Sequence, residues 1–385
     1  MILIYENKKI MKLKFLLFIA LLFVLLPSYA QKEHKTKNVV VILIDGYRWQ
    51  ELFKGADFDL LSDKKYNTGD SLQRFKKYWS ENLEKRRKKL MPFTWSEIAK
   101  HGQLYGNRDL GNFMNVANPY WFSYPGRAEI LSGFVDTAIN SNEYGSNPNT
   151  NVLEFIDNQN EYKGKVVTFA CWRATGRCLH KDESSMLINV PWEDIAGNNL
   201  TEAEILANEM QHFIPQIWGD DERLDANVYA LAKSYIMAHH PKVAYLDFGD
   251  TDEYAHSGKY ENYLDDIHNL DAMIGKLWEM MQKDDFYKNN TTFFIVPDHG
   301  RGVGAGWTDH GSGTQHSNET WLMVMGPDSK PSGEMKDREQ IFQTQFAATI
   351  ADVLGFDYMV PGKSVGEKIK TVSNSSRNSK PVRRQ

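Results

Sequence analysis

Aspartate and histidine residues, of the types that bind metal ions, follow the apolar runs of this sequence at several places. They are Asp45, Asp252, His256, Asp298, His299 and His316. Asp252 and His256 stand four residues apart, which places both side chains on one face of a helical turn. Carboxylate oxygens and neutral imidazole nitrogens are ligands of zinc. The pattern predicts one metal site at Asp252 and His256 and a second at the adjacent Asp298 and His299.

Each of these residues, taken singly, also has an ordinary explanation. An aspartate after a strand often caps a turn, and a lone histidine usually satisfies a hydrogen bond. The joint occurrence of the residues at successive strand ends is what favours metal binding.

Ser123 is the candidate nucleophile. It precedes Pro125-Gly126 and an apolar, helix-like run in the stretch WFSYPGRAEILSG. Its hydroxyl is expected near a helix N-terminus, where backbone N–H groups and the helix dipole favour an anion. The alternative is that Ser123 is only a helix cap, a position that serine favours. Coordination to a divalent ion would lower the pKa of the hydroxyl and allow attack at neutral pH.

Apolar runs alternate with helical patterns along most of the chain. The expected strands are 37–45, 165–169, 243–248, 291–296 and 321–325, and the expected helices are 200–213, 225–238, 260–281 and 340–354. Continuous β-branched runs are typical of parallel strands that are covered on both faces. We therefore expect a three-layer α/β/α sandwich with a mainly parallel central sheet and cap insertions. The candidate ligands would meet at the carboxyl ends of its strands.

Two segments are expected to be insertions. Residues 62–100 are rich in charged and aromatic side chains and are predicted to form a solvated helical segment. Residues 182–225 are expected to form part of a cap over the site. The two cysteines, Cys171 and Cys178, could close a small disulfide loop in an oxidising compartment or remain as buried thiols.

The first residues of the chain have the zones of a secretory signal. Lys12 and Lys14 precede an apolar run from Phe15 to Leu26, and a small-residue segment ends at Ala30. We expect a signal peptide at 1–30, a catalytic domain at 31–370 in the periplasm or outside the cell, and a disordered tail at 371–385. The apolar run is shorter than the ~20 residues of a spanning helix, so no membrane span is expected after cleavage.

The charge of the chain excludes one class of partner. The formal charge is -5, and it becomes about -8 without residues 1–30, by the usual counting of side chains at neutral pH. A nucleic-acid-binding surface is not expected from such an acidic chain. The expected partner is a small molecule.

The order of the motifs resembles that of the alkaline phosphatase superfamily, especially its nucleotide pyrophosphatase/phosphodiesterase-like branch. The motifs are LIDGYRW, SYPGRAEILSG, DTDEYAH, PDHG and HSNETWLMVMGP, and they run from about Asn38 to Leu354. The resemblance implies one zinc ion held by Asp252, His256 and His316. It implies a second zinc ion held by Asp45, Asp298, His299 and Ser123. It further implies hydrolysis of a phosphomonoester or phosphodiester through a phosphoseryl intermediate on Ser123.

The nucleophile segment departs from that branch, which typically has Thr-Phe-Pro-Asn where Ser123 and Gly126 occupy the ends here. A downstream asparagine of the branch donates to the phosphate, and the candidates are Asn140, Asn142 and Asn147. Arg127 is expected to contact the substrate, because a guanidinium matches phosphate geometry, and the alternative is that it points into a surface salt bridge. Tyr124 is expected beside the substrate as well. The neighbouring aromatic residues favour a diester, whereas Arg127, Arg173 and Arg177 would serve a monoester.

The segment from Ser123 to Arg127 also fits the Ser/Cys-x-Pro-x-Arg pattern of the sulfatases, which share the fold. That resemblance implies formylglycine at position 123 and a single Ca²⁺. Two features argue against it: Gly46 follows Asp45, where sulfatases typically have paired acidic residues, and three imidazoles favour zinc over calcium. A third possibility is a non-catalytic surface binding protein, whose mark would be a lost ligand position. The sequence retains all six positions.

Overall fold

β1 (Asn38–Ile44) runs through the centre of the folded chain, and all seven of its residues are buried. This burial is expected of a β-branched strand with layers on both faces. The computed structural model describes residues 34–69 and 71–373. The signal peptide predicted at 1–30 lies outside the described residues, as does nearly all of the predicted tail at 371–385.

The main sheet has the strand order β10-β2-β9-β7-β1-β6-β4-β5. Its other strands are β2 (Gln103–Tyr105), β4 (Val166–Ala170), β5 (Leu187–Asn189), β6 (Val243–Phe248), β7 (Thr291–Val296), β9 (Leu322–Met325) and β10 (Gly333–Glu334). β1 pairs in parallel with both β6 and β7, and β9 runs antiparallel to β7 and β2. The sheet is thus mainly parallel, as predicted. A small second sheet joins β11 (Gln340–Phe342), β3 (Phe113–Asn115) and β8 (Glu319–Thr320).

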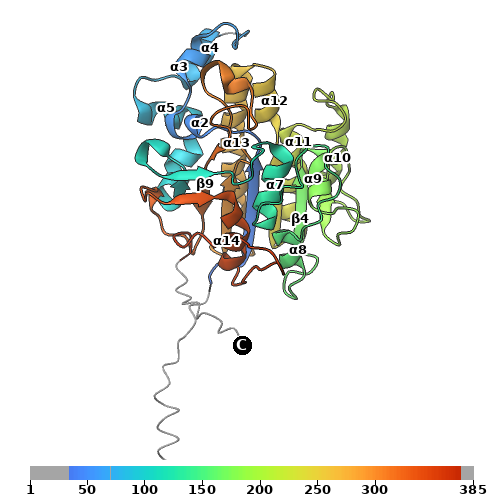
Figure 1. Ribbon diagram of the computed structural model, residues 1–385. Coiled ribbons are helices and arrows are strands. Elements are labelled where there is room, and N and C mark those ends of the chain that lie inside the picture. The colour runs from blue at the N-terminus through green and yellow to red at the C-terminus, as the bar shows by residue number, and fades with distance from the viewer. Residues whose placement is uncertain (1–33, 70, 374–385) are drawn as a thin grey trace, which may run out of the picture. The chain divides into compact units, whose positions relative to one another are not determined.

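Helices cover both faces of the main sheet (Figure 1). One face packs on α7 (Ser123–Ser132), α8 (Val152–Asp157), α9 (Arg173–Cys178) and α14 (Phe346–Val353). The other packs on α11 (Asp225–His239) and α13 (Tyr260–Met281). Val41 of β1 belongs to the first core, and its neighbour Ile42 belongs to the second. This alternation confirms the three-layer α/β/α arrangement.

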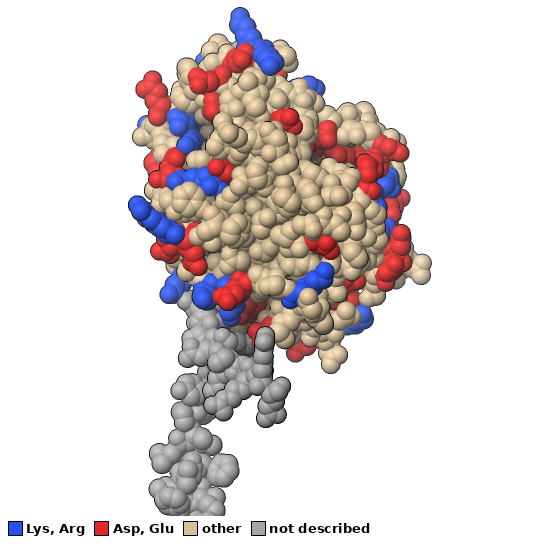
Figure 2. Space-filling model, in the orientation of Figure 1, with Lys and Arg blue, Asp and Glu red and all other residues tan. Residues whose placement is uncertain are grey.

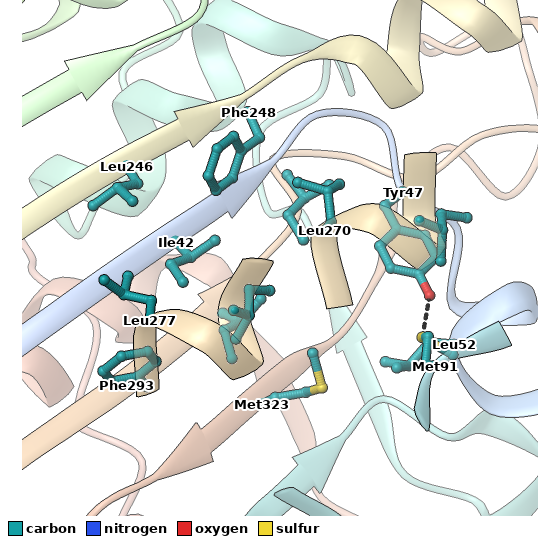
Figure 3. Close-up of a cluster of buried hydrophobic side chains, with 14 of the residues drawn as sticks. Ile42, Tyr47, Leu52, Met91, Leu246, Phe248, Leu270, Leu277, Phe293 and Met323 are labelled. Atoms are coloured by element: carbon teal, nitrogen blue, oxygen red, sulfur yellow. Dashed lines mark hydrogen bonds between the residues drawn. The ribbon is translucent and has the colours of Figure 1, made fainter. Parts of the chain in front are cut away.

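Figure 3 shows part of the second core, where Ile42 lies among side chains of the neighbouring strands and of α13. Each fully buried aliphatic side chain of this kind stabilises the fold by about 1.5–3 kcal/mol. Tyr47, just beyond β1, belongs to the same core, and its hydroxyl donates to the sulfur of Met91 at 2.7 Å. The chain after β1 is therefore held firmly beside the strand end that carries Asp45.

The remaining helices lie around these layers. They are α2 (Trp49–Lys54), α3 (Phe58–Ser62), α4 (Ser71–Tyr78), α5 (Leu83–Leu90), α6 (Ala99–His101), α10 (Glu202–Phe213) and α12 (Asp250–His256). Short helical turns add the π-type η1 (Thr94–Ile98) and the 3-10 turns η2 (Arg108–Leu110), η3 (Gly304–Thr308) and η4 (Gln343–Gln345).

Residues 62–100 differ in part from the predicted solvated insertion. They are helical, but Leu90, Trp95 and Ile98 are buried in the core that also holds α13. The sparse apolar positions of this charged segment are the reason that its sequence did not indicate packing. The predicted helix 340–354 begins only at Phe346, because residues 340–342 form β11.

The two cysteines are free thiols, and both are buried. Of the two alternatives for this pair, the structure therefore has buried thiols and not the disulfide loop.

The surface carries mixed charge. In Figure 2, acidic and basic side chains are interspersed around the edge of the face in view, and its middle carries few of either. Within the described residues, no helix is both long and apolar enough to cross a bilayer.

Candidate metal centre and nucleophile

The candidate site lies at the carboxyl ends of three neighbouring central strands. Asp45 follows β1, α12 with Asp252 and His256 follows β6, and Asp298 and His299 follow β7. Because parallel strands end at the same edge of a sheet, residues far apart in the sequence converge there. Ser123 joins them as the first residue of α7.

One cluster forms around His299. Its Nδ1 donates to the carbonyl oxygen of Gly300 at 2.9 Å, which leaves Nε2 as the coordinating nitrogen of the neutral ring. Nε2 lies 3.1 Å from Asp45 Oδ1, 3.3 Å from Ser123 Oγ and 3.8 Å from Asp298 Oδ1. Burial opposes a charged ring, yet Asp298 and Asp45 raise the pKa of His299 to about 9. The lone pair on His299 Nε2 faces two buried carboxylates, so a proton or a metal ion must lie between Nε2 and the carboxylate oxygens.

A second cluster forms around Asp252. His256 Nε2 lies 3.0 Å from Asp252 Oδ2 and 3.0 Å from His310 Nε2, and His310 Nε2 lies 3.8 Å from Asp252 Oδ2. Ligand atoms around a tetrahedral zinc ion are about 3.3 Å apart, since the bonds measure ~2.0–2.2 Å. Burial lowers the pKa of His310 to about 3, so its ring is neutral. These three side chains fit a zinc site, and Asp252 also reaches the first cluster.

His310 was not among the metal ligands predicted from the sequence. Its ring stacks on that of His299, with 4.0 Å between the ring centroids, and so bridges the two clusters. The signal was present in the sequence, because Asp309-His310-Gly311 repeats the Asp-His-Gly triplet at 298–300.

His316 is not brought into either cluster of the described residues. Its Nδ1 contacts Glu319 Oε1 at 3.0 Å, and 40% of its side chain is exposed. A carboxylate on one ring nitrogen is the usual support for a histidine whose other nitrogen binds a metal. His316 thus has the carboxylate partner that is usual for a metal-binding histidine, but it does not lie close to the other ligands.

The two histidines can be distinguished by substitution. We expect His310→Ala to lose the metal ion at Asp252 and His256, and His316→Ala to retain it, because only His310 has a nitrogen within ligand distance. The measurement is the number of metal ions per chain by elemental analysis, with folding checked by circular dichroism. Retention in His310→Ala and loss in His316→Ala would reverse the assignment.

Arg127 is a positioning residue in this structure. Its guanidinium contacts Asp298 and lies 2.9 Å from both Asp45 Oδ2 and Asp247 Oδ1. It joins residues of three adjacent strand ends and is fully buried. The expectation that Arg127 contacts substrate is not met, because its donors face carboxylates and no part of it is exposed.

Arg301 has a comparable role on the other side of the site. It contacts Asp252 Oδ1, lies 3.3 Å from His256 Nδ1, and donates to the carbonyls of Trp307 and Thr308. The buried carboxylates at the site are those of Asp45, Asp247, Asp252 and Asp298. These four carboxylates outnumber the two guanidiniums of Arg127 and Arg301, and such an excess of acidic groups suits a site for divalent cations.

Tyr124 does not present its side chain to the site. It is fully buried, and its hydroxyl donates to the carbonyl of Gly145 at 2.6 Å. The expectation that it binds substrate is therefore not met. Its backbone N–H donates to the side chain of Asn142 at 3.0 Å. Of the three candidate asparagines, Asn142 is thus the one that lies beside the nucleophile segment.

Glu222 is a further acidic residue near the site that the sequence did not indicate. Burial, together with Glu253 and Asp45, raises the pKa of Glu222 to about 9. It is therefore protonated at neutral pH and can donate a hydrogen bond. It lies just before α11 and does not follow a strand, so the pattern of acidic residues at strand ends did not include it.

Gly126 allows α7 to approach the turn after β7. A Cβ atom at this position would lie 2.5 Å from the carbonyl oxygen of Asp298. The first turn of α7 and the Asp298 backbone therefore pack in direct contact. This approach leaves no room for a side chain at position 126.

We expect Gly126→Ala to destabilise the protein by about 1–3 kcal/mol, because two backbones must separate. Turnover should fall by about 10²-fold, since a shift of ~1 Å in a reacting group has such an effect. The measurements are thermal unfolding and kcat on an aryl phosphate ester. Gly145→Ala is the control, because a Cβ there meets no atom within 4 Å. Equal behaviour of the two variants would contradict the close packing.

A family model described as the Metalloenzyme superfamily matches residues 182–358. The matched segment contains Asp252, His256, Asp298 and His299, together with both His310 and His316. No curated protein sequence matches the chain.

Solved structures with a similar fold come from several kinds of enzyme. Alkaline phosphatase PafA matches with a TM-score of 0.57 and 12% identity, over 88% of this chain and 99% of that chain. A putative sulfatase from Bacteroides thetaiotaomicron matches with a TM-score of 0.51 and 15% identity, over 88% and 76%. The lipoteichoic acid synthase LtaP from Listeria monocytogenes matches with a TM-score of 0.51 and 11% identity, over 91% and 79%. The chain is thus similar to the Metalloenzyme superfamily over residues 182–358, and it shares its fold with an alkaline phosphatase and a putative sulfatase.

Proposed function

We propose that the chain hydrolyses phosphoric esters with Ser123 as the nucleophile and two zinc ions as cofactors. The observation that carries the proposal is the position of Ser123. Its Oγ lies 3.3 Å from His299 Nε2, in the cluster that also contains Asp45. It also begins α7, whose dipole favours negative charge on the attacking oxygen.

The ligand sets follow from the two clusters. Asp45, Ser123, Asp298 and His299 would hold one ion, and Asp252, His256 and His310 would hold the other, with His316 as the alternative to His310. Zinc ions held there would stabilise the charge that develops on the attacking and leaving oxygens. The buried Asp45 Oδ1 has no hydrogen-bond partner. Its lone pairs are therefore free to bind a cation.

The chain's own groups define the proposed reaction. Ser123 Oγ gives up its proton and bonds to phosphorus while the bond from phosphorus to the leaving oxygen breaks, and the leaving oxygen takes up a proton and departs as the alcohol. A water oxygen then bonds to phosphorus, the bond from phosphorus to Ser123 Oγ breaks, and a proton from the water returns to Oγ. Asn142, held against the N–H of Tyr124, would donate from its side-chain amide to a phosphoryl oxygen. Arg127 keeps Asp45 and Asp298 in place throughout.

The surroundings of Gly46 support phosphate over sulfate esters. A Cβ at Gly46 would lie 2.3 Å from Asp252 Oδ1 and 2.8 Å from Arg301 Nη1. The space that a second acidic residue would need after Asp45 is thus taken by Asp252. We propose sulfatase chemistry only as the alternative, on the strength of the Ser123 to Arg127 pattern.

The side chains nearest Ser123 favour a diester. Trp121 and Phe122 are half-buried directly before it and offer apolar surface for a second ester group. The cationic candidates for a monoester are already engaged: Arg177 donates to the carbonyls of Tyr144 and Asn142, and Arg173 pairs with Asp221.

The test combines metal analysis with three substrates. We expect two zinc ions per chain and turnover of a bis-aryl phosphate above that of an aryl phosphate, with no turnover of an aryl sulfate. Mass spectrometry of the peptide with Ser123 should find serine or phosphoserine. Calcium in the protein, sulfate-ester turnover and formylglycine at position 123 would together overturn the proposal.

A further inference from the structure

Three aspartates outside the proposed active site meet where three helices converge. Asp225 is the first residue of α11, Asp250 is the first residue of α12, and Asp266 lies within α13. One carboxylate oxygen of each lies within 4.8 Å of the others, and all three residues are buried. We refer to Asp225, Asp250 and Asp266 as the tri-aspartate site.

Two of the three carboxylates accept hydrogen bonds from nearby donors. Gly249 N donates to Asp225 Oδ1 at 2.7 Å, and Asp225 N donates to Asp250 Oδ2 at 3.1 Å. Trp218 Nε1 donates to Asp250 Oδ1 at 2.8 Å. These bonds account for the presence of two acidic groups at helix starts and indicate no ligand by themselves.

Asp266 is different. It is only 6% exposed, and it lies in mid-helix, where the backbone N–H groups are used within the helix. Its Oδ2 has no hydrogen-bond partner among the described residues. Its charged neighbours are the acidic Asp225, Asp250 and Asp265, and Asp265 already pairs with Arg74 and Lys77. A buried carboxylate without a counter-charge is strongly unfavourable, so protons or a cation must neutralise the group.

We propose that the tri-aspartate site binds one divalent, oxygen-seeking cation of the calcium class. Ca²⁺ binds carboxylate oxygens at about 2.3–2.6 Å and accepts irregular geometry. Oxygens within 4.8 Å of one another can all contact a single ion of that kind. The ion ties the starts of α11 and α12 to α13. Because Asp252 and His256 follow on α12, the same ion fixes the helix that carries part of the metal centre.

The test uses Tb³⁺ as a luminescent probe for Ca²⁺ in the zinc-saturated protein. The indole of Trp218 contacts Asp250 directly, so excitation of tryptophan should sensitise an ion at this site. We expect Tb³⁺ emission that saturates at one ion per chain and is displaced by Ca²⁺. Saturating Ca²⁺ should also raise the melting temperature by about 3–6 °C, since it binds only the folded chain.

Matched variants separate this site from the zinc centre. Asp266→Asn should abolish both responses, and Asp265→Asn, its neighbour on the same helix, should keep both. Trp218→Phe should lose most of the emission and keep the Ca²⁺-dependent rise in melting temperature, which preserves the test if Asp266→Asn fails to fold. The proposal would be overturned if Ca²⁺ did not change the melting temperature of the wild type and if Asp266→Asn were at least as stable as the wild type. That result would mean that protons neutralise the site. None of these readouts depends on catalysis.

Discussion

Ser123→Ala is expected to lower kcat on phosphate esters by at least about 10³-fold, in line with the loss of other covalent nucleophiles. The physical reason is that the variant lacks the hydroxyl that lies 3.3 Å from His299 Nε2 in the wild type. Zinc should remain bound, because Asp45, Asp298 and His299 are unchanged. Turnover and metal content are measured on the same preparation.

Two further variants make this result specific. Ser123→Thr keeps a hydroxyl at the position and should retain part of the activity. Ser132→Ala removes a buried hydroxyl at the other end of α7, where it donates to the carbonyl of Phe134, and should leave kcat unchanged. If Ser123→Ala turned over substrate at the wild-type rate, the nucleophile would be another group.

Asp252→Asn is expected to release at least one zinc ion per chain and to lower kcat by about 10³-fold or more. Asp252 belongs to both clusters, so a neutral amide at this position weakens the binding of both ions. Although burial raises its pKa, the buried Arg301 guanidinium holds the pKa of Asp252 well below the ordinary value, so the charge is present at neutral pH. Elemental analysis and steady-state kinetics measure the two effects.

The same substitution should reduce the free energy of unfolding by about 1–3 kcal/mol, because the buried Arg301 loses a charged acceptor. Asp221→Asn is the control. Its ion pair with Arg173 is exposed and such pairs contribute ~0–1 kcal/mol, so neither metal content nor activity should change. Full zinc occupancy in Asp252→Asn would argue against Asp252 as a shared ligand.

Much of the fold and the outline of the site were open to prediction from the sequence. The predicted ranges of β6, β7 and α13 agree with the structure, because continuous apolar runs and a helical period are local properties. Residues placed directly after such strands must lie at one sheet edge. For this reason Asp45, Asp252, Asp298 and His299 could be expected to converge, and they do.

The tertiary structure alone decided which neighbours those residues have. It placed His310 rather than His316 beside Asp252. It also placed Arg127, which was expected to contact the substrate, in ion pairs with three carboxylates. It also brought Asp266 against Asp225 and Asp250 from a separate helix. Such contacts depend on how loops and helices pack after the sheet has formed. Residue type and spacing thus determined the kind of chemistry expected, and packing decided which side chains stand within reach of it.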